Sequence, residues 1–157
     1  MRDFWESCFF AAMDYLEWGL PGLFLACFLA ATLLPLPSEA VLLAAYALGI
    51  DPVSALLAAS VGNVLGGTTN YALGYWGSQT RLYGILKPEQ EKFHVWNQRV
   101  NKWGAYLGLI SWVPFIGDPM VLVLGFFRVP FWKLLFWMSL GKFLRYLVIS
   151  LLYWQIF

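Results

Sequence analysis

Residues 20–50 read LPGLFLACFLAATLLPLPSEAVLLAAYALGI, two apolar runs interrupted by Pro35 and Pro37. Each run is shorter than the roughly 20 helical residues needed to cross a bilayer. Two such runs joined at a proline can enter the membrane and leave by the same face, provided that the irregular backbone is buried in protein or lines a wet cavity. We therefore predict a re-entrant hairpin whose tip includes Pro35, Pro37 and Ser38.

The same pattern returns later in the chain. Two short apolar runs, Trp103–Val113 and Pro119–Phe127, flank a segment that contains Pro114 and Gly117, and we predict the tip of a second re-entrant hairpin there. A shift of 79 positions aligns Pro35 with Pro114, Glu39 with Asp118, Ser60 with Ser139, and Gly62 with Gly141. The sequence therefore predicts an internal repeat.

Each hairpin is followed by an apolar run long enough to span a bilayer, Val53–Tyr75 after the first and Phe131–Phe157 after the second. Because one spanning helix separates the two hairpins, we expect them to enter from opposite faces. Inverted repeats of this kind are typical of secondary transporters, in which broken helices form the binding site near the middle of the membrane.

The composition excludes a soluble globular protein. Of the 157 residues, 61% are hydrophobic and only 12% are charged, whereas soluble domains have about 25% charged residues. So few charges cannot cover a surface exposed to water, and they also argue against disorder or a coiled coil. We predict an all-α integral membrane protein with a single membrane domain, residues 1–157. The net charge of +1 gives no indication of a nucleic-acid partner.

Two further segments complete the predicted domain. Acidic residues at helical spacing in residues 1–18 indicate an amphipathic helix in the membrane interface rather than a signal peptide. Residues 77–102 form a polar loop between repeat 1 (residues 20–75) and repeat 2 (residues 103–157). If both hairpins are re-entrant, the loop side holds seven cationic residues, namely Arg81, Lys87, Lys92, Arg99, Lys102, Arg128 and Lys133. The positive-inside rule then places the loop in the cytoplasm and both termini outside.

Two acids follow the predicted tips, Glu39 and Asp118. An ionised carboxylate within a bilayer is costly, and such groups usually mark ion or proton pathways. Because desolvation raises the pKa of a carboxyl and a nearby cation lowers it, we predict that both acids couple transport to protons. The alternative is a static buried ion pair with Lys142 or Arg145.

Lys142 and Arg145 lie three residues apart, on one face of a helix and far from its predicted ends. Two fixed cations at this depth suit a phosphate or another anionic headgroup. We predict that Arg128, near the cytoplasmic side, recruits the headgroup, the alternative being an ordinary positive-inside anchor. Asn63 and Asn70 lie on a stripe of small and polar residues in residues 53–75. Its glycines indicate close helix packing, and the two asparagines are candidates for lining the substrate cavity.

The sequence carries none of the enzyme motifs HExxH, GxSxG and GxxxxGK[ST], so we predict no catalytic residues, no metal site and no cofactor. His94, the single histidine, lies in the polar loop. Cys8 and Cys27 lie in apolar runs without a metal-binding spacing, where cysteine acts as a small buried hydrophobe.

Four groups of residues carry a resemblance to a known family: Thr32-Leu33-Leu34-Pro35 with Ser38-Glu39, Gly62-Asn63 with Gly66-Gly67 and Thr69-Asn70, Ser111-Trp112 with Pro114 and Gly117-Asp118, and Gly141-Lys142 with Arg145-Tyr146. Together they resemble the DedA membrane family, also called the VTT or SNARE-associated Golgi protein superfamily, and its YqaA-type branch in particular. The resemblance covers roughly residues 20–150.

The resemblance implies paired re-entrant hairpins in a bacterial inner-membrane protein, and a role in lipid transport that depends on the proton-motive force. Relatives are associated with recycling of undecaprenyl phosphate or with phospholipid translocation. The better-studied branch has arginines around the proline of the second hairpin, where this chain has Trp112 and either Gly117 or Asp118. Only Lys142 and Arg145 could replace them, so the departure concerns the substrate more than the fold.

We therefore expect a proton-coupled transporter or flippase of a lipid with an anionic headgroup, either a polyprenyl phosphate or a phospholipid. Its partners would be membrane lipids, protons and a second copy of the chain in a homodimer. Two alternatives remain open. One is a non-catalytic assembly or scaffold protein that acts through its polar loop, and the other is a proton-coupled exporter of small cations.

Overall fold

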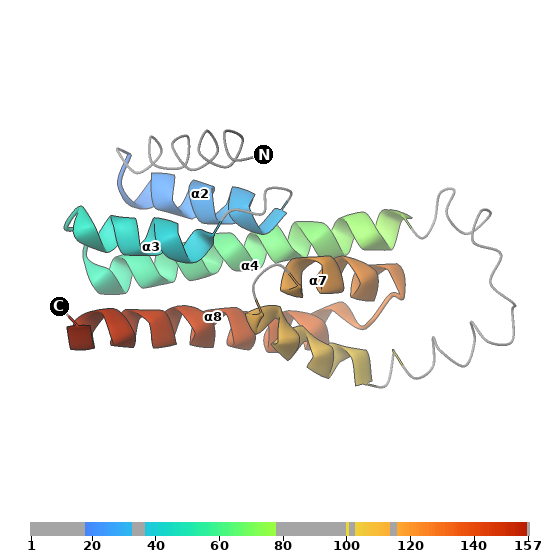
Figure 1. Ribbon diagram of the computed structural model, residues 1–157. Coiled ribbons are helices and arrows are strands. Elements are labelled where there is room, and N and C mark those ends of the chain that lie inside the picture. The colour runs from blue at the N-terminus through green and yellow to red at the C-terminus, as the bar shows by residue number, and fades with distance from the viewer. Residues whose placement is uncertain (1–17, 33–36, 78–99, 101–102, 114–115, 157) are drawn as a thin grey trace, which may run out of the picture. The chain divides into compact units, whose positions relative to one another are not determined.

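The computed structural model describes residues 18–32, 37–77, 100, 103–113 and 116–156. Within these ranges the chain is helical and has no strand, so the predicted all-α fold is confirmed there (Figure 1). The elements are α2 (Leu20–Thr32), α3 (Ser38–Ala47), α4 (Pro52–Gly77), the 3₁₀ helix η1 (Gly108–Trp112), α7 (Gly117–Phe126) and α8 (Phe131–Ile156). Residues 103–107 are also helical and lead into η1.

Several predicted features lie outside the described residues. These are the interfacial helix except for Trp18, nearly all of the polar loop with His94, and Pro35 and Pro114 of the two predicted tips. They remain predictions.

Among the described residues, one helix is long and apolar enough to cross a membrane, Phe131–Gln155 in α8, with a mean hydropathy of 1.5. α4 has the same length as α8, 26 residues, or about 39 Å at 1.5 Å per residue. Its serine, threonine, asparagine and glycine residues make it less apolar. The predicted second crossing, by residues 53–75, therefore remains a prediction.

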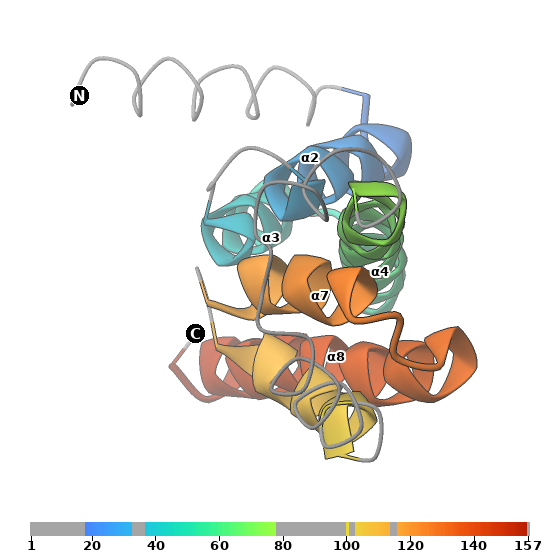
Figure 2. The same cartoon turned by 90° about the vertical axis from the view of Figure 1, so that its right-hand side faces the viewer.

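The chain divides into two compact units. Unit 1 contains α2, α3, the first part of α4 to Gly66 and the last part of α8 from Lys142; unit 2 contains residues 103–107, η1, α7 and the remainder of α4 and α8. In unit 1, α2 lies against both α3 and α4 (Figure 2). Its apolar core is built mainly from Leu23, Cys27, Val41, Leu42 and Tyr146, all fully buried.

Glycines bring the helices of each unit close together, as the stripe on residues 53–75 predicts. A Cβ on Gly66 would lie 2.6 Å from Phe28 O and from Ala31 Cβ, both on α2. In unit 2, a Cβ on Gly74 would collide with the carbonyl oxygen of Leu122 on α7. Small residues therefore permit these backbone contacts, which is the usual source of stability between helices in lipid.

The helix boundaries repeat along the chain. Each boundary of α7 and α8 lies 79 residues after the corresponding boundary of α3 and α4 (38 to 117, 47 to 126, 52 to 131 and 77 to 156). The interval that aligns the prolines and acids of the sequence therefore also aligns the helices.

The turns after α3 and α7 repeat at the same interval. After α3, Gly49 has φ 80° and Ile50 N donates to Ala45 O at 3.1 Å; after α7, Arg128 has φ 55° and Val129 N donates to Leu124 O at 3.1 Å. Both are Schellman motifs, in which a residue in the left-handed region ends the helix. The first turn uses glycine for this conformation and the second uses arginine.

Candidate functional site

Unit 1 contains a cluster of polar side chains inside its apolar core. The cluster consists of Ser38 and Glu39 at the start of α3, Asn63 on α4, and Lys142, Arg145 and Tyr146 on α8. Sequence spacing explains the contribution of α8, because residues three and four apart lie on one face of a helix. The contribution of α3 follows from Pro37, which precedes the helix and leaves Ser38 and Glu39 in its first turn.

Lys142 is the deepest charge in the cluster, with 1% of its surface exposed. Its Nζ donates to the carbonyl oxygen of Asn63 at 2.9 Å and to Asn63 Oδ1 at 2.6 Å. An ammonium group withdrawn from water is tolerated only when it is hydrogen-bonded. Asn63 therefore stabilises Lys142 with both of its oxygen atoms.

Asn63 also links Lys142 to the rest of the cluster. Its Nδ2 donates to Ser38 Oγ at 3.2 Å and to the hydroxyl of Tyr146. Since the amide oxygen faces Lys142 and the amide nitrogen faces Ser38 and Tyr146, these hydrogen bonds fix the orientation of the amide.

The Arg145 side chain contacts two residues in the N-terminal turn of α3. Its Nε lies 3.4 Å from Glu39 Oε1, and its NH2 donates to Ser38 Oγ at 3.2 Å. The side chains of Arg145 and Glu39 are 11% and 24% exposed, so this ion pair is less buried than Lys142. The first turn of a helix favours negative charge, which suits the position of the Glu39 carboxylate.

The structure thus brings together four of the residues predicted for proton coupling or substrate binding, Glu39, Asn63, Lys142 and Arg145, with Ser38 of the predicted hairpin tip. The contact between Glu39 and Arg145 is one of the ion pairs that the sequence analysis gave as the alternative to proton coupling. Whether Glu39 takes up protons stays a prediction.

The remaining candidates belong to unit 2. Asp118 lies partly buried in the first turn of α7, and Asn70 is 3% exposed on α4. Arg128 is exposed at the turn after α7, with its guanidinium 5.2 Å from the centroid of the Tyr75 ring. An exposed arginine beside an aromatic ring is compatible with the predicted contact with a headgroup.

Three residues of the predicted hairpin tips are described. Pro37 is exposed and precedes α3, while Ser38 is 3% exposed and belongs to the cluster. Gly117 is buried, and a Cβ there would lie 2.6 Å from Ser111 Cα. Glycine is therefore required where the backbones of η1 and α7 approach each other.

Our sequence interpretation did not select Tyr146 as a site residue. Its side chain is completely buried, its hydroxyl accepts a hydrogen bond from Asn63, and its ring centroid lies 5.3 Å from the Arg145 guanidinium carbon. The signal was present in the sequence, since Tyr146 lies four residues after Lys142 and so shares its helix face.

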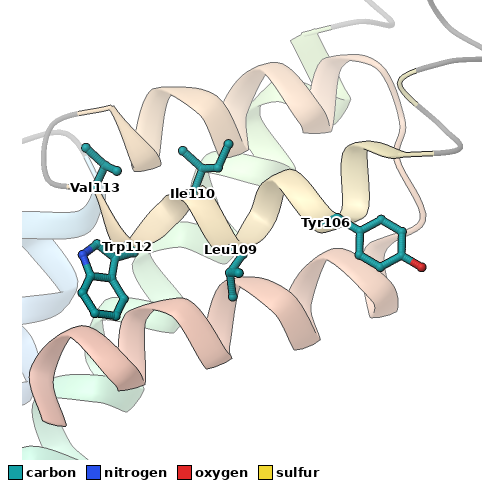
Figure 3. A pocket seen from close by; sticks show the side chains of 5 residues that line it. All are labelled: Tyr106, Leu109, Ile110, Trp112 and Val113. Atoms are coloured by element: carbon teal, nitrogen blue, oxygen red, sulfur yellow. The ribbon is translucent and has the colours of Figure 1, made fainter. Parts of the chain in front are cut away.

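Unit 2 carries a shallow apolar groove of about 320 Å³ (Figure 3). Five side chains line it: Tyr106, Leu109, Ile110, Trp112 and Val113. It presents few polar groups, so it does not provide the chemistry of the cluster in unit 1. Among the described residues, no three His, Cys, Asp or Glu side chains are grouped as a metal site would require, and Cys27 is a buried free thiol.

Comparisons with known proteins identify the family of this chain. The family model of the VTT domain matches residues 36–155. Inner membrane protein YqaA of Escherichia coli K12 is 40% identical over 135 residues, which cover 84% of this chain and 89% of the relative; YqaA of Shigella flexneri matches equally well. An uncharacterized protein of Haemophilus influenzae is 28% identical over 152 residues, covering 92% and 93% of the two chains. No solved structure matches. The chain therefore belongs to the VTT domain family of DedA membrane proteins, as its motifs predict.

Proposed function

We propose that this chain is a multi-pass protein of the bacterial inner membrane that moves a lipid with an anionic headgroup across the bilayer, driven by protons. The observation that carries the proposal is the cluster of Glu39, Asn63, Lys142 and Arg145 within packed helices, one of which is long and apolar enough to cross a membrane. Intramembrane charges that face one another are typical of substrate and proton pathways. The family membership and the inner-membrane relatives favour the same location.

Cations in the cluster favour an anionic substrate. A guanidinium offers a planar set of donors that matches the oxygens of a phosphate, and an ammonium acts on phosphate as a point charge. We propose that Lys142, Arg145 and Asn63 of unit 1 bind the headgroup phosphate. In unit 2, we propose that Asn70 also contacts the lipid and that Arg128 recruits it at the cytoplasmic side. Glu39 and Asp118 exchange the coupled protons.

The inverted repeat is part of this proposal, and three observations support it. Helix boundaries and turns recur at 79 residues. Tyr46 on α3 is hydrogen-bonded to Ser150 on α8, and Gly125 on α7 packs on Tyr71 of α4. A shift of 79 residues converts position 46 to 125 and position 71 to 150, so each short helix packs on the long helix of the other repeat.

The Lys142–Asn63 hydrogen bonds supply the third observation, because positions 63 and 142 are themselves 79 residues apart. In a chain built as two copies related by a two-fold axis, a position contacts its own equivalent only beside that axis. Repeats of this kind surround the binding sites of secondary transporters, and we propose that both hairpins are re-entrant in the same way.

Reconstitution in liposomes tests the proposal. The sidedness of labelled polyprenyl phosphate and of labelled phospholipid would be followed with and without a pH gradient. We expect the wild type to move one of these lipids faster under the gradient, and Glu39→Gln and Asp118→Asn to lose the acceleration. Asp51→Asn is the matched control, because Asp51 is an exposed carboxylate that precedes α4, outside the cluster. An unchanged headgroup sidedness for every lipid would contradict the proposal.

Glu39→Gln, together with further variants, separates the two alternatives. A scaffold protein would lose function when residues 77–102 are replaced but would tolerate Glu39→Gln. An exporter of small cations would respond to Glu39→Gln and tolerate a neutral side chain at position 142 or 145. We further propose a homodimer, and a monomer at all protein-to-lipid ratios would contradict that part.

A further inference from the structure

The ion pair between Glu39 and Arg145 is the accessible end of the polar cluster. Glu39 Oε1 lies 3.4 Å from Arg145 Nε, and the carboxylate side chain is 24% exposed. Lys142, by contrast, is 1% exposed and donates to both oxygens of Asn63. An anion that reaches the cluster would therefore meet the Arg145 guanidinium before the Lys142 ammonium.

We propose that Glu39 and the phosphate of the lipid compete for the Arg145 guanidinium, so that Glu39 takes up a proton from water as the phosphate binds. This inference rests on the proposed function and adds the step at which proton and lipid are coupled. The carboxylate gains a proton and loses its ionic contact, and the phosphate takes over that contact.

The geometry of Arg145 explains why the competition centres on this residue. One part of its guanidinium, NH2, is held by the neutral hydroxyl of Ser38, while Nε faces Glu39. A phosphate that contacts Arg145 would bring a second anion next to the Glu39 carboxylate. Two neighbouring anions disfavour each other's charged forms, and protonation of Glu39 removes this repulsion.

Among the described residues, other titratable groups also lie near Arg145 and Glu39. Lys142 and Tyr146 lie on α8, Cys27 on α2, and the neutral Asn63 on α4. Phenols, thiols and ammonium groups in water titrate above pH 8, whereas a carboxyl beside a second anion holds its proton more tightly, so Glu39 is the group that we expect to take up the proton. Asp118 of unit 2 is a second carboxyl candidate and is tested separately below.

Coupling between two ligands is reciprocal, so the lipid must favour protonation of Glu39 by the same factor by which acid favours binding of the lipid. The probe must not titrate itself. A phosphate monoester has a second pKa near 6, so we choose phosphatidylglycerol, a phosphodiester that keeps one negative charge from pH 5.5 to 7.5.

The experiment uses the full chain in nanodiscs of zwitterionic lipid, with phosphatidylglycerol added at pH 5.5 and at pH 7.5. Binding is measured together with proton uptake in weakly buffered solution. For the wild type we expect about tenfold tighter binding at pH 5.5, within the roughly 5–150-fold range of coupled sites, and uptake of protons on binding at pH 7.5.

Glu39→Gln places a neutral side chain of the same shape beside Arg145. We expect it to bind the lipid at both pH values as tightly as the wild type does at pH 5.5, and to take up no proton. Asp51→Asn should behave as the wild type. Size-exclusion profiles identify any variant that fails to fold, and Glu39→Asp, which retains a carboxyl, should recover part of the pH dependence.

Three results would overturn the inference: weaker binding by Glu39→Gln than by the wild type at pH 5.5, unchanged pH dependence in Glu39→Gln, or loss of the pH dependence only in Asp118→Asn. These results leave the proposed function intact if lipid still moves in liposomes. Failure of the wild type to bind the phosphodiester at either pH, together with no lipid movement, would remove the proposed function as well.

Discussion

At the scale of single residues, the two charges of the cluster are stabilised in different ways. Lys142 is fully buried and bonded to the two oxygens of Asn63, whereas Arg145 faces a carboxylate and is partly exposed. Removal of one partner of a buried charged hydrogen bond costs more than the bond contributes, because the remaining group is left without solvation. Stability measurements can therefore distinguish these two environments.

We predict that Asn63→Ala lowers the free energy of unfolding by about 1–3 kcal/mol, because it removes the amide oxygen that accepts from Lys142. Thermal unfolding in detergent or nanodiscs measures the change. Ser60→Ala is the matched control on the same helix. The Ser60 hydroxyl is buried and makes no hydrogen bond with the described residues, so its loss should leave stability unchanged or slightly higher. Equal losses in the two variants would show that the Lys142 bonds contribute little.

Arg128 occupies a left-handed conformation, φ 55°, where the equivalent turn has Gly49. This conformation costs a non-glycine residue roughly 1–2 kcal/mol, while glycine loses about 0.5–1 kcal/mol through its flexible unfolded state. Arg128→Gly also removes the contact between the guanidinium and the Tyr75 ring, and this loss offsets the remaining gain in stability. We therefore predict that Arg128→Gly stays within about 1 kcal/mol of wild-type stability.

The same variant separates structure from recruitment. If Arg128 binds the headgroup, Arg128→Gly should slow lipid movement although its stability stays close to that of the wild type. Lipid movement at the wild-type rate would indicate an ordinary interfacial anchor.

At the scale of the elements, glycine sets the distance between α2 and α4. A Cβ at Gly62 would collide with the carbonyl oxygen of Phe24, a backbone atom that cannot move aside on its own. We predict that Gly62→Ala destabilises the protein by about 1–3 kcal/mol, as overpacking usually does. Gly77→Ala is the control at the end of the same helix, where a Cβ meets nothing within 4 Å. Similar melting temperatures for the two variants would contradict the close contact.

The start of α4 provides a prediction on pH. Asp51 precedes the helix, and its Oδ2 accepts a hydrogen bond from Ser54 N at 2.9 Å. Hydrogen bonds from Ser54 hold the pKa of the Asp51 carboxyl below its ordinary value of 3.8. Because the pKa is lowered in the folded state, the stabilisation is present above the unfolded value and is lost as the pH falls through the folded value.

We therefore expect the melting temperature of the wild type to fall more steeply below about pH 4 than that of Asp51→Ala. Asp51→Ala should melt at a lower temperature near neutral pH, with the difference shrinking as the solution is acidified. A constant difference from pH 6 to pH 3 would show that Asp51 does not act through its charge.

The helices themselves were largely predictable from the sequence. Pro35, Pro37 and Pro114 interrupt the apolar runs, and α3 and α7 begin just after them because proline cannot continue a preceding helix. The interval between Glu39 and Asp118 also matched the interval between helices. The partners within the cluster were harder to predict, because two cations and two acids allow several pairings and only the packed structure selects Glu39 with Arg145.

The sequence also did not predict that Lys142 would be hydrogen-bonded to an amide rather than to a carboxylate. Asn63 was predicted to line a cavity, and the sequence pattern did not indicate that its carbonyl and amide oxygens would accept from the same ammonium. A stripe of small and polar residues shows which side chains share a helix face, but it does not show how deeply the side chain on the neighbouring helix is buried. More of the fold than of the candidate site could therefore be predicted from the sequence.

At the scale of the whole molecule, topology is the open prediction. We predict two re-entrant hairpins and two crossings, which would place both termini on the outer side and residues 77–102 in the cytoplasm. Alkaline phosphatase fused to either terminus should be active, and a cysteine placed in the loop should react only with permeant reagents in intact cells. Activity at one terminus alone would mean that one hairpin crosses the membrane completely.

The Lys142–Asn63 bond has a consequence for how two similar halves can diverge. If a position meets its own counterpart, identical side chains must tolerate each other, and two ammonium groups 3 Å apart would repel strongly. A lysine can therefore be accommodated there in one half only if the other half supplies oxygen. A chain with both halves joined covalently can hold this asymmetry permanently, whereas two identical half-length chains could not.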